Sequence, residues 1–80
     1  MKTIEVVYFA LLRDKANKTN ETIEINASTL KELYQELSGR YDFELPAEMI
    51  QVAVNDEFTS INSPLLSQSK VVFIPPVAGG

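Results

Sequence analysis

The chain has 80 residues, of which 45% are hydrophobic and 22% charged, and these values indicate one small folded domain rather than a disordered chain. Seven basic and eleven acidic residues give a net charge of −4, which disfavours nucleic acid and anionic membranes as partners. Cysteine and histidine are both absent, so the sequence excludes disulfides, a thiolate nucleophile and the commonest metal ligand. We therefore expect no metal site and no catalytic constellation of side chains. The early charge in Met1–Glu5 argues against a signal peptide, and we expect a cytoplasmic protein.

The first part of the chain predicts a hairpin of two strands. Residues from Thr3 to Leu12 alternate along the chain but leave apolar side chains on both faces, which is typical of a strand that is covered on both sides or is covered later by a partner. Arg13–Asn20 is polar and predicts the turn. Thr22–Asn26 alternates again and predicts the second strand, with its isoleucines pointing inward.

A helix is predicted over residues 30–38. Thr29 as the N-cap and Glu32 three residues later form the pattern of a capping box. Leucines at positions 30, 33 and 37 recur at the spacing of one helical face, and Tyr34 extends the same stripe. Gly39 is expected to end the helix, because glycine readily adopts the left-handed conformation found after the last helical turn.

Three short strands are predicted in the second half of the chain. Alternation over residues 50–54 indicates the first, and Asn55–Asp56 has the composition of a tight turn that returns into Phe58–Ser60. Residues 70–74 form the last strand, which the following two prolines end. The predicted order is β-β-α-β-β-β, an α+β fold in which one main helix packs across one face of a mixed sheet. Residues 1–80 are expected to form this single domain.

The predicted sheet has more apolar residues than one helix can cover, because one helix covers only one face. The expected core side chains are Ile4, Val6, Tyr8, Val71 and Phe73, and those on the opposite face are Val7, Phe9, Phe58, Val72 and Ile74. Packing under loops is one explanation for the second set. We favour a docking face, since burying each large apolar side chain against a partner is worth roughly 1.5–3 kcal/mol.

The C-terminal segment is expected to be a flexible, extended arm over residues 75–80. Pro75 and Pro76 favour an extended exit from the last strand, and Gly79 and Gly80 have no side chain. Such an arm, ending in a free carboxylate, can enter a narrow channel where a Cβ atom would clash. A frayed terminus without a function is the alternative.

The motifs Phe9-Ala10-x-x-Arg13, Ala53-Val54-Asn55 and the run from Val72 to Gly80 resemble the MoaD family over essentially the whole chain. That family is the small, ubiquitin-like β-grasp subunit of molybdopterin synthase. The resemblance implies a sulfur carrier with no permanently bound cofactor. A MoeB-like activating enzyme would use ATP to adenylate the Gly80 carboxylate, and a sulfur donor protein would convert it to a thiocarboxylate. In a heterotetramer with a MoaE-like large subunit, the sulfur would pass to a cyclic pyranopterin precursor and form the dithiolene of molybdopterin.

The resemblance also implies residue roles. Gly80 provides the reactive carbonyl, and Gly79 gives access to it. Phe9, Phe58 and Ile74 match family positions in an apolar interface shared by both partners, which Val7 and Val72 are expected to extend. The segment expected to thread the partner's channel consists of Pro75, Pro76, Val77 and Ala78. Arg13 matches a recurrent basic residue, which pairs either with a partner carboxylate or in an exposed salt bridge of the chain itself.

Three parts of the sequence depart from the family pattern. Three other functions are also compatible with much of this pattern. Ser67–Lys70 replaces a segment that often holds glycine and acidic residues, Lys15–Lys18 lacks a common glycine, and Ile74 replaces a common aromatic residue. These departures bear on loop conformation and on local charge toward a partner. The alternative functions are a carrier for thiamine or tRNA thiolation, a ubiquitin-like tag conjugated to lysines, and an interaction module with an inert tail.

Overall fold

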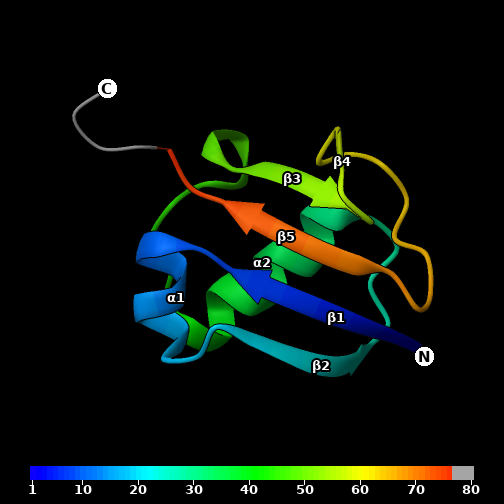
Figure 1. The fold of residues 1–80 in the computed structure, drawn as a ribbon, viewed down its shortest axis with the longest axis horizontal. Helices are drawn as coiled ribbons and strands as arrows, with labels where there is room; N and C mark the ends of the chain where they lie inside the picture. Colours follow the sequence, from blue (N-terminus) through cyan, green and yellow to red (C-terminus); the bar gives the residue numbers. More distant parts are fainter. Residues whose placement is uncertain (77–80) are drawn as a thin grey trace.

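Five strands form one mixed sheet in the order β2-β1-β5-β3-β4, and the main helix α2 crosses one of its faces (Figure 1). The computed structural model describes residues 1–76. The central strands β1 and β5 run parallel, and the other neighbours are antiparallel. The predicted α+β fold, with a mixed sheet and one main helix, is confirmed. The elements are β1 (Lys2–Tyr8), α1 (Ala10–Ala16), β2 (Asn20–Ile25), α2 (Leu30–Tyr41), the 3₁₀ turn η1 (Ala47–Met49), β3 (Gln51–Val54), β4 (Glu57–Thr59) and β5 (Lys70–Ile74).

The short helix α1 corrects the predicted first hairpin. β1 ends at Tyr8 rather than at residue 12, and the first half of the segment predicted as a turn is helical. Ala10 turns the chain out of the sheet with a φ of 52°, and Leu12 and Ala16 then bury one face of the helix in the core. Asn17 ends α1 in the left-handed conformation, at a φ of 60°. Asparagine tolerates this conformation, which explains how the segment manages without a glycine.

The start of α2 is as predicted, and its end is not. The Thr29 hydroxyl oxygen accepts a hydrogen bond from the backbone N–H of Glu32 at 3.2 Å, which confirms the N-cap. Gly39 does not end the helix. It lies inside α2, and Asp42 takes the left-handed position with a φ of 58°. The extra turn brings Tyr41 to the core edge, where its ring packs against Phe43, and this packing outweighs the low helix propensity of one glycine.

The three C-terminal strands are confirmed, and two of their connections use left-handed residues. Asn55 and Asp56 have φ angles of 51° and 73°, as a two-residue hairpin turn between β3 and β4 requires. Gln68, in the segment that departs from the family pattern, has a φ of 64°. Its backbone N–H donates to the carbonyl of Thr3 at 2.7 Å, which ties the segment before β5 to β1. A conformation that glycine would adopt freely is therefore held here by a tertiary hydrogen bond.

The core lies between the sheet and α2, and the predicted division of strand residues between its two faces is correct. Ile4, Val6 and Tyr8 of β1 are fully buried, as are Val71 and Phe73 of β5. Aromatic rings fill the end of this core that lies under the end of β1, with neighbouring ring centroids 5.4–6.0 Å apart. They belong to Tyr8, Tyr34, Tyr41, Phe43 and Phe73.

One carboxylate joins β1, β2 and the end of α2. Oε2 of Glu21 accepts hydrogen bonds from the hydroxyls of Tyr8 at 2.5 Å and Tyr41 at 2.7 Å. Nζ of Lys18 lies 3.3 Å from the other oxygen and 5.3 Å from the centroid of the Tyr41 ring. Burial works to raise the pKa of Glu21, but these hydrogen bonds outweigh it and hold the pKa below the ordinary value of a glutamate. The charged form of Glu21 therefore stabilises the fold.

Glu21→Gln is expected to lower the free energy of unfolding by about 1–2 kcal/mol at neutral pH, because it removes charge-assisted hydrogen bonds. A folded-state pKa below the unfolded value gives stability that is present above the unfolded pKa and is lost as the pH falls through the folded one. The variant should therefore lose less stability than the wild type on acidification. Urea unfolding at neutral pH and at about pH 3 measures both effects. Glu24→Gln, at an exposed position of the same strand, is the control, and equal behaviour of the two variants would contradict the prediction.

Candidate functional site

An apolar row crosses the face of the sheet that α2 leaves uncovered. The strand register aligns Val7 of β1 with Val72 of β5, Val72 with Ala53 of β3, and Ala53 with Phe58 of β4. The residues that precede Val7, Ala53 and Val72 are buried in the core, so these side chains point to the opposite face. Four neighbouring strands thus contribute one continuous line of apolar side chains, which we call the apolar row.

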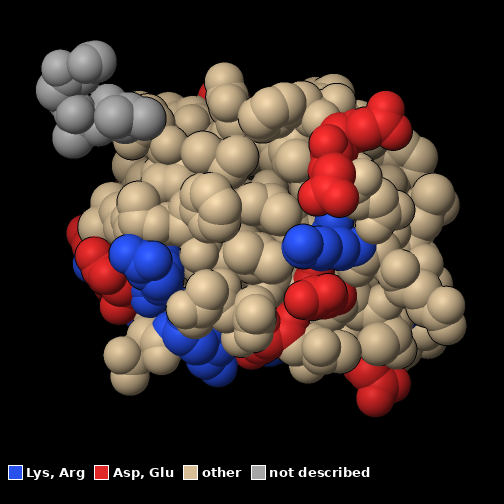
Figure 2. Space-filling view, in the orientation of Figure 1, with Lys and Arg blue, Asp and Glu red and all other residues tan. Residues whose placement is uncertain are grey.

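Phe9 and Ile74 extend the apolar row toward the end of β5. Phe9 is 48% exposed and Phe58 is 71% exposed, whereas Val7, Val72 and Ile74 are half-buried. Figure 2 shows a broad uncharged area on this face, between basic side chains at the left of the view and a band of acidic and basic side chains that crosses the face to the right of centre. The structure therefore brings together on one face all five apolar residues that the sequence predicted for it. Ala53, which is buried on this same face, was missed.

The root of the C-terminal tail lies beside this face. β5 ends at Ile74, Pro75 is buried, and Pro76 is exposed. Val77, Ala78, Gly79 and Gly80, to which the sequence assigns the channel-threading and reactive roles, lie outside the described residues. Because β5 carries both Val72 and Ile74, a protein that covers the apolar row also contacts the point where the tail leaves the fold.

Arg13 lies on α1 rather than in a hairpin turn. It is exposed, and α1 packs beside the end of β5 (Figure 1). Among residues 1–76, the guanidinium of Arg13 forms no ion pair, in contrast to that of Arg40, which pairs with Glu36 at 3.4 Å. Of the two roles considered for Arg13, the intramolecular salt bridge is therefore not formed within this part of the chain.

Asn55 has a role that the sequence reasoning missed. Its backbone N–H donates to the carbonyl of Lys70 at 2.9 Å, and its side-chain Oδ1 accepts from the backbone N–H of Lys70 at 3.0 Å. This pair of bonds fixes the start of β5 against the hairpin of β3 and β4. An asparagine between a strand and a turn was the available signal, but its partner is distant in the sequence.

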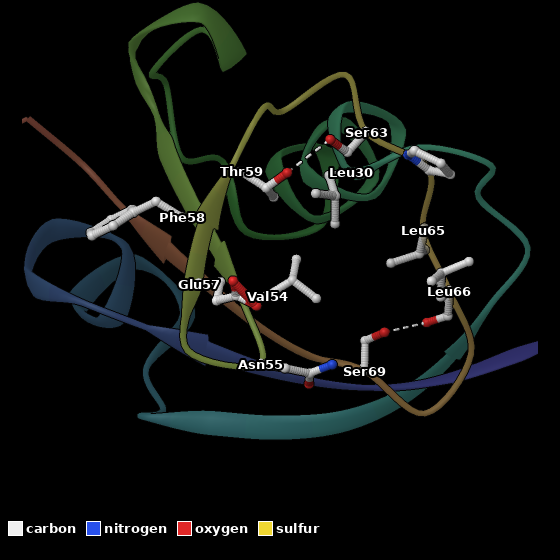
Figure 3. A pocket seen from close by; sticks show the side chains of 11 residues that line it. Leu30, Val54, Asn55, Glu57, Phe58, Thr59, Ser63, Leu65, Leu66 and Ser69 are labelled. Atoms are coloured by element: carbon white, nitrogen blue, oxygen red, sulfur yellow. Dashed lines mark hydrogen bonds between the residues drawn. The ribbon is translucent and has the colours of Figure 1, made fainter.

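A groove of about 400 Å³ lies beyond the apolar row, between β4 and the segment that leads to β5. Figure 3 shows the side chains of Leu30, Val54 and Leu65 lining it, while the ring of Phe58 points away. The hydroxyls of Thr59 and Ser63 at its rim bond to each other at 2.9 Å. Such a lining provides apolar contacts and no paired acid and base.

Two structural requirements concern residues 1–76, a cluster of ligands for a metal site and a long apolar helix for a membrane span. This part of the chain contains no group of three or more acidic side chains placed to hold a metal ion. None of its helices is long and apolar enough to cross a membrane.

A five-stranded mixed sheet that clasps one main helix, with a tail leaving from a central strand, is the ubiquitin-like β-grasp fold. The chain belongs to the ThiS family, whose model matches residues 6–80. The resemblance to the MoaD family is also confirmed. The molybdopterin synthase sulfur carrier subunit of Escherichia coli (strain K12) is 30% identical over 80 residues, which cover 96% of this chain and 99% of that protein.

Two further relatives also match this chain over nearly the full length of both proteins. The molybdopterin synthase sulfur carrier subunit of Mycobacterium tuberculosis is 30% identical over 83 residues, which cover 100% of both chains. A chain from the complex of subunits 1 and 2 of the molybdopterin-converting factor of Helicobacter pylori is 28% identical with a TM-score of 0.63. That match covers 98% of this chain and 99% of the Helicobacter pylori chain.

Proposed function

We propose that this chain is the sulfur carrier subunit of a molybdopterin synthase and that Gly80 ends it as a thiocarboxylate. The observation that carries the proposal is the position of β5. This strand supplies the centre of the apolar row and continues into the tail, so docking on the row directs the tail into the partner. Relatives of the same length, named as sulfur carrier subunits of molybdopterin synthase, support this reading.

The sulfur has to come from other proteins, because the chain contains no cysteine. A carboxylate is a poor electrophile, and transfer of AMP from ATP, with release of pyrophosphate, gives it a leaving group. The terminal sulfur of a protein persulfide attacks the acyl carbonyl and displaces AMP. A second thiol then attacks the sulfur that belongs to the donor, so that the sulfur–sulfur bond breaks and a disulfide and the Gly80 thiocarboxylate are formed.

The thiocarboxylate is delivered to a large subunit that covers the apolar row. Phe9, Phe58 and Ile74 contact this subunit, and Arg13 pairs with one of its carboxylates. Residues from Pro75 to Gly79 thread its channel, and Gly80 passes sulfur to the cyclic pyranopterin precursor. The activating enzyme uses the same face, so the carrier leaves one partner before it meets the other. The Helicobacter pylori complex of the two subunits supports this assembly.

Mass spectrometry of the intact protein and of its C-terminal peptide tests the proposal directly. The protein is incubated with a MoeB-like enzyme, ATP and a persulfide donor, and we expect a sulfur-for-oxygen mass gain on Gly80 that a thiol alkylator traps. Alkylation is needed because oxidation of Met1 or Met49 gives nearly the same gain. A bond between Gly80 and a lysine would indicate that the chain is a tag conjugated to other proteins. A carboxylate that stays unmodified under all conditions would contradict the proposal that the chain carries sulfur.

The acceptor separates molybdopterin synthesis from the other thiolation pathways. The trapped thiocarboxylate is mixed with the large subunit and the pyranopterin precursor, and we expect formation of the dithiolene. If the thiocarboxylate forms but its sulfur passes only to a thiamine precursor or a tRNA, the chain is still a sulfur carrier, but it serves a pathway other than molybdopterin synthesis.

A further inference from the structure

We propose that Lys70 is a second charged contact of the docking face and that it selects a large subunit with a carboxylate opposite it. This inference rests on the proposed function and adds a determinant of partner choice. Lys70 is exposed and begins β5, in which Val71 and Phe73 point into the core. Its side chain therefore projects from the same face as Val72.

Lys70 and Arg13 differ from the other basic residues in their contacts within the fold. The chain has seven basic residues, all within residues 1–76, and five of them contact acceptors of this part of the chain. These five are Lys2, Lys15, Lys18, Lys31 and Arg40, bonded to Ala27, Glu44, Glu21, Glu48 and Glu36 respectively. In an acidic chain, the two cations without such a contact in residues 1–76 are Arg13 and Lys70.

These two cations lie at opposite ends of the docking face. Arg13 is on α1, beside the end of β5, and Lys70 is at the start of β5. Figure 2 shows basic side chains over α1 and over the start of β5, with the uncharged area between them and with acidic side chains on both sides of the basic group over β5. A partner that covers the apolar row and presents a carboxylate at each end would complement this arrangement.

The backbone that carries Lys70 is held on two sides. Asn55 bonds to both its N–H and its carbonyl, and the carbonyl of the preceding Ser69 accepts from the N–H of Glu5 at 3.0 Å. Binding therefore orders only the side chain of Lys70, which limits the entropic cost of the contact.

Glu5 is the acidic neighbour of Lys70, and it allows a second prediction with the opposite effect on binding. It lies opposite Lys70 in the parallel register and is exposed on the same face. The two side chains form no ion pair in the part of the chain that the structure describes, but at this spacing Glu5 partly offsets the charge of Lys70. A partner carboxylate opposite Lys70 would be repelled by Glu5. Neutralising Lys70 should therefore weaken binding, and neutralising Glu5 should strengthen it.

The test measures affinity of the full chain for the large subunit from the same cells, by calorimetry at low and high salt. We expect Lys70→Gln to raise the Kd about two- to fivefold at ~0.05 M salt, and the effect to disappear near ~1 M salt, where charges are screened within about 3 Å. Glu5→Gln is expected to lower the Kd. Lys31→Gln is the matched control, because it makes the same charge change on α2, on the other side of the sheet.

Each other result overturns the inference. Equal Kd values for Lys70→Gln and Lys31→Gln would show that Lys70 faces no charge. Tighter binding by Lys70→Gln and weaker binding by Glu5→Gln would show that the partner presents a cation to Glu5 instead. Formation of the Gly80 thiocarboxylate is measured in the same variants. If the wild-type chain forms the thiocarboxylate and binds the large subunit, but Lys70→Gln leaves the Kd unchanged, the proposed function stands and this inference is wrong. If the wild-type chain does not bind the large subunit, both are wrong.

Discussion

Removal of Gly79 and Gly80 is expected to abolish sulfur transfer and leave the fold intact. Every buried residue of the core cluster lies between Ile4 and Phe73, and the last buried residue that the structure describes is Pro75. The shortened chain should therefore keep its free energy of unfolding within about 0.5 kcal/mol. It loses the carboxylate that the activating enzyme adenylates, so no thiocarboxylate can form at the correct distance from the docking face. Circular dichroism and urea unfolding measure the first expectation, and a transfer assay with the large subunit measures the second.

The control for this truncation keeps the length of the tail. Gly80→Ala retains a terminal carboxylate and adds one Cβ atom, so it should still be adenylated, but more slowly where the channel is narrow. Binding of the truncated chain to the large subunit should persist, because the apolar row is unchanged. Sulfur transfer by the truncated chain at the wild-type rate would contradict the proposed role of Gly80.

Local patterns in the sequence were sufficient to predict which strand residues face the core. Alternation in β1 and β5 has a period of two, and in both strands the set that α2 covers is apolar, apart from Lys2 at the start of β1. The capping box at Thr29 and the Asn55–Asp56 turn are also local, since each depends on residues within one turn of the chain. These features agree with the structure because no distant contact has to decide them.

Elements that depend on distant contacts could not be predicted. α1 has only Leu12 and Ala16 as its buried face, and the apolar residues before them continue the alternation of β1. Its position is set by packing against β5, far away in the sequence. The helix end at Asp42 likewise depends on Tyr41 reaching Glu21.

The face that carries the apolar row also combines features that local sequence predicts with features that distant contacts decide. Alternation selected its large apolar members, but the apolar row exists only because β3 lies between β5 and β4 in the sheet. Ala53 fills the gap between Val72 and Phe58, and nothing in the sequence indicates that a small residue is needed there. The hydrogen bonds between Asn55 and the backbone of Lys70 could likewise be predicted only if the strand register were known.

Phe58→Asp is expected to weaken binding to the large subunit at least about a hundredfold without destabilising the fold. The side chain is 71% exposed in the free chain, so the change should alter the free energy of unfolding by no more than about 0.5 kcal/mol. In the complex, the variant loses the burial of a phenylalanine, worth roughly 1.5–3 kcal/mol, and places an unpaired carboxylate beside the apolar row. Together these effects exceed the roughly 2.7 kcal/mol that corresponds to a hundredfold change in Kd.

Leu66→Asp is the matched control for Phe58→Asp. Leu66 is 66% exposed, so the two variants remove a similarly exposed apolar side chain and add the same charge. Leu66 lies in the segment before β5, outside the apolar row, and its variant should bind like the wild type. Equal weakening by both variants would mean that negative charge alone opposes the partner. Wild-type binding by Phe58→Asp would remove the apolar row from the interface, and the tail would then have to reach its partner from a different surface.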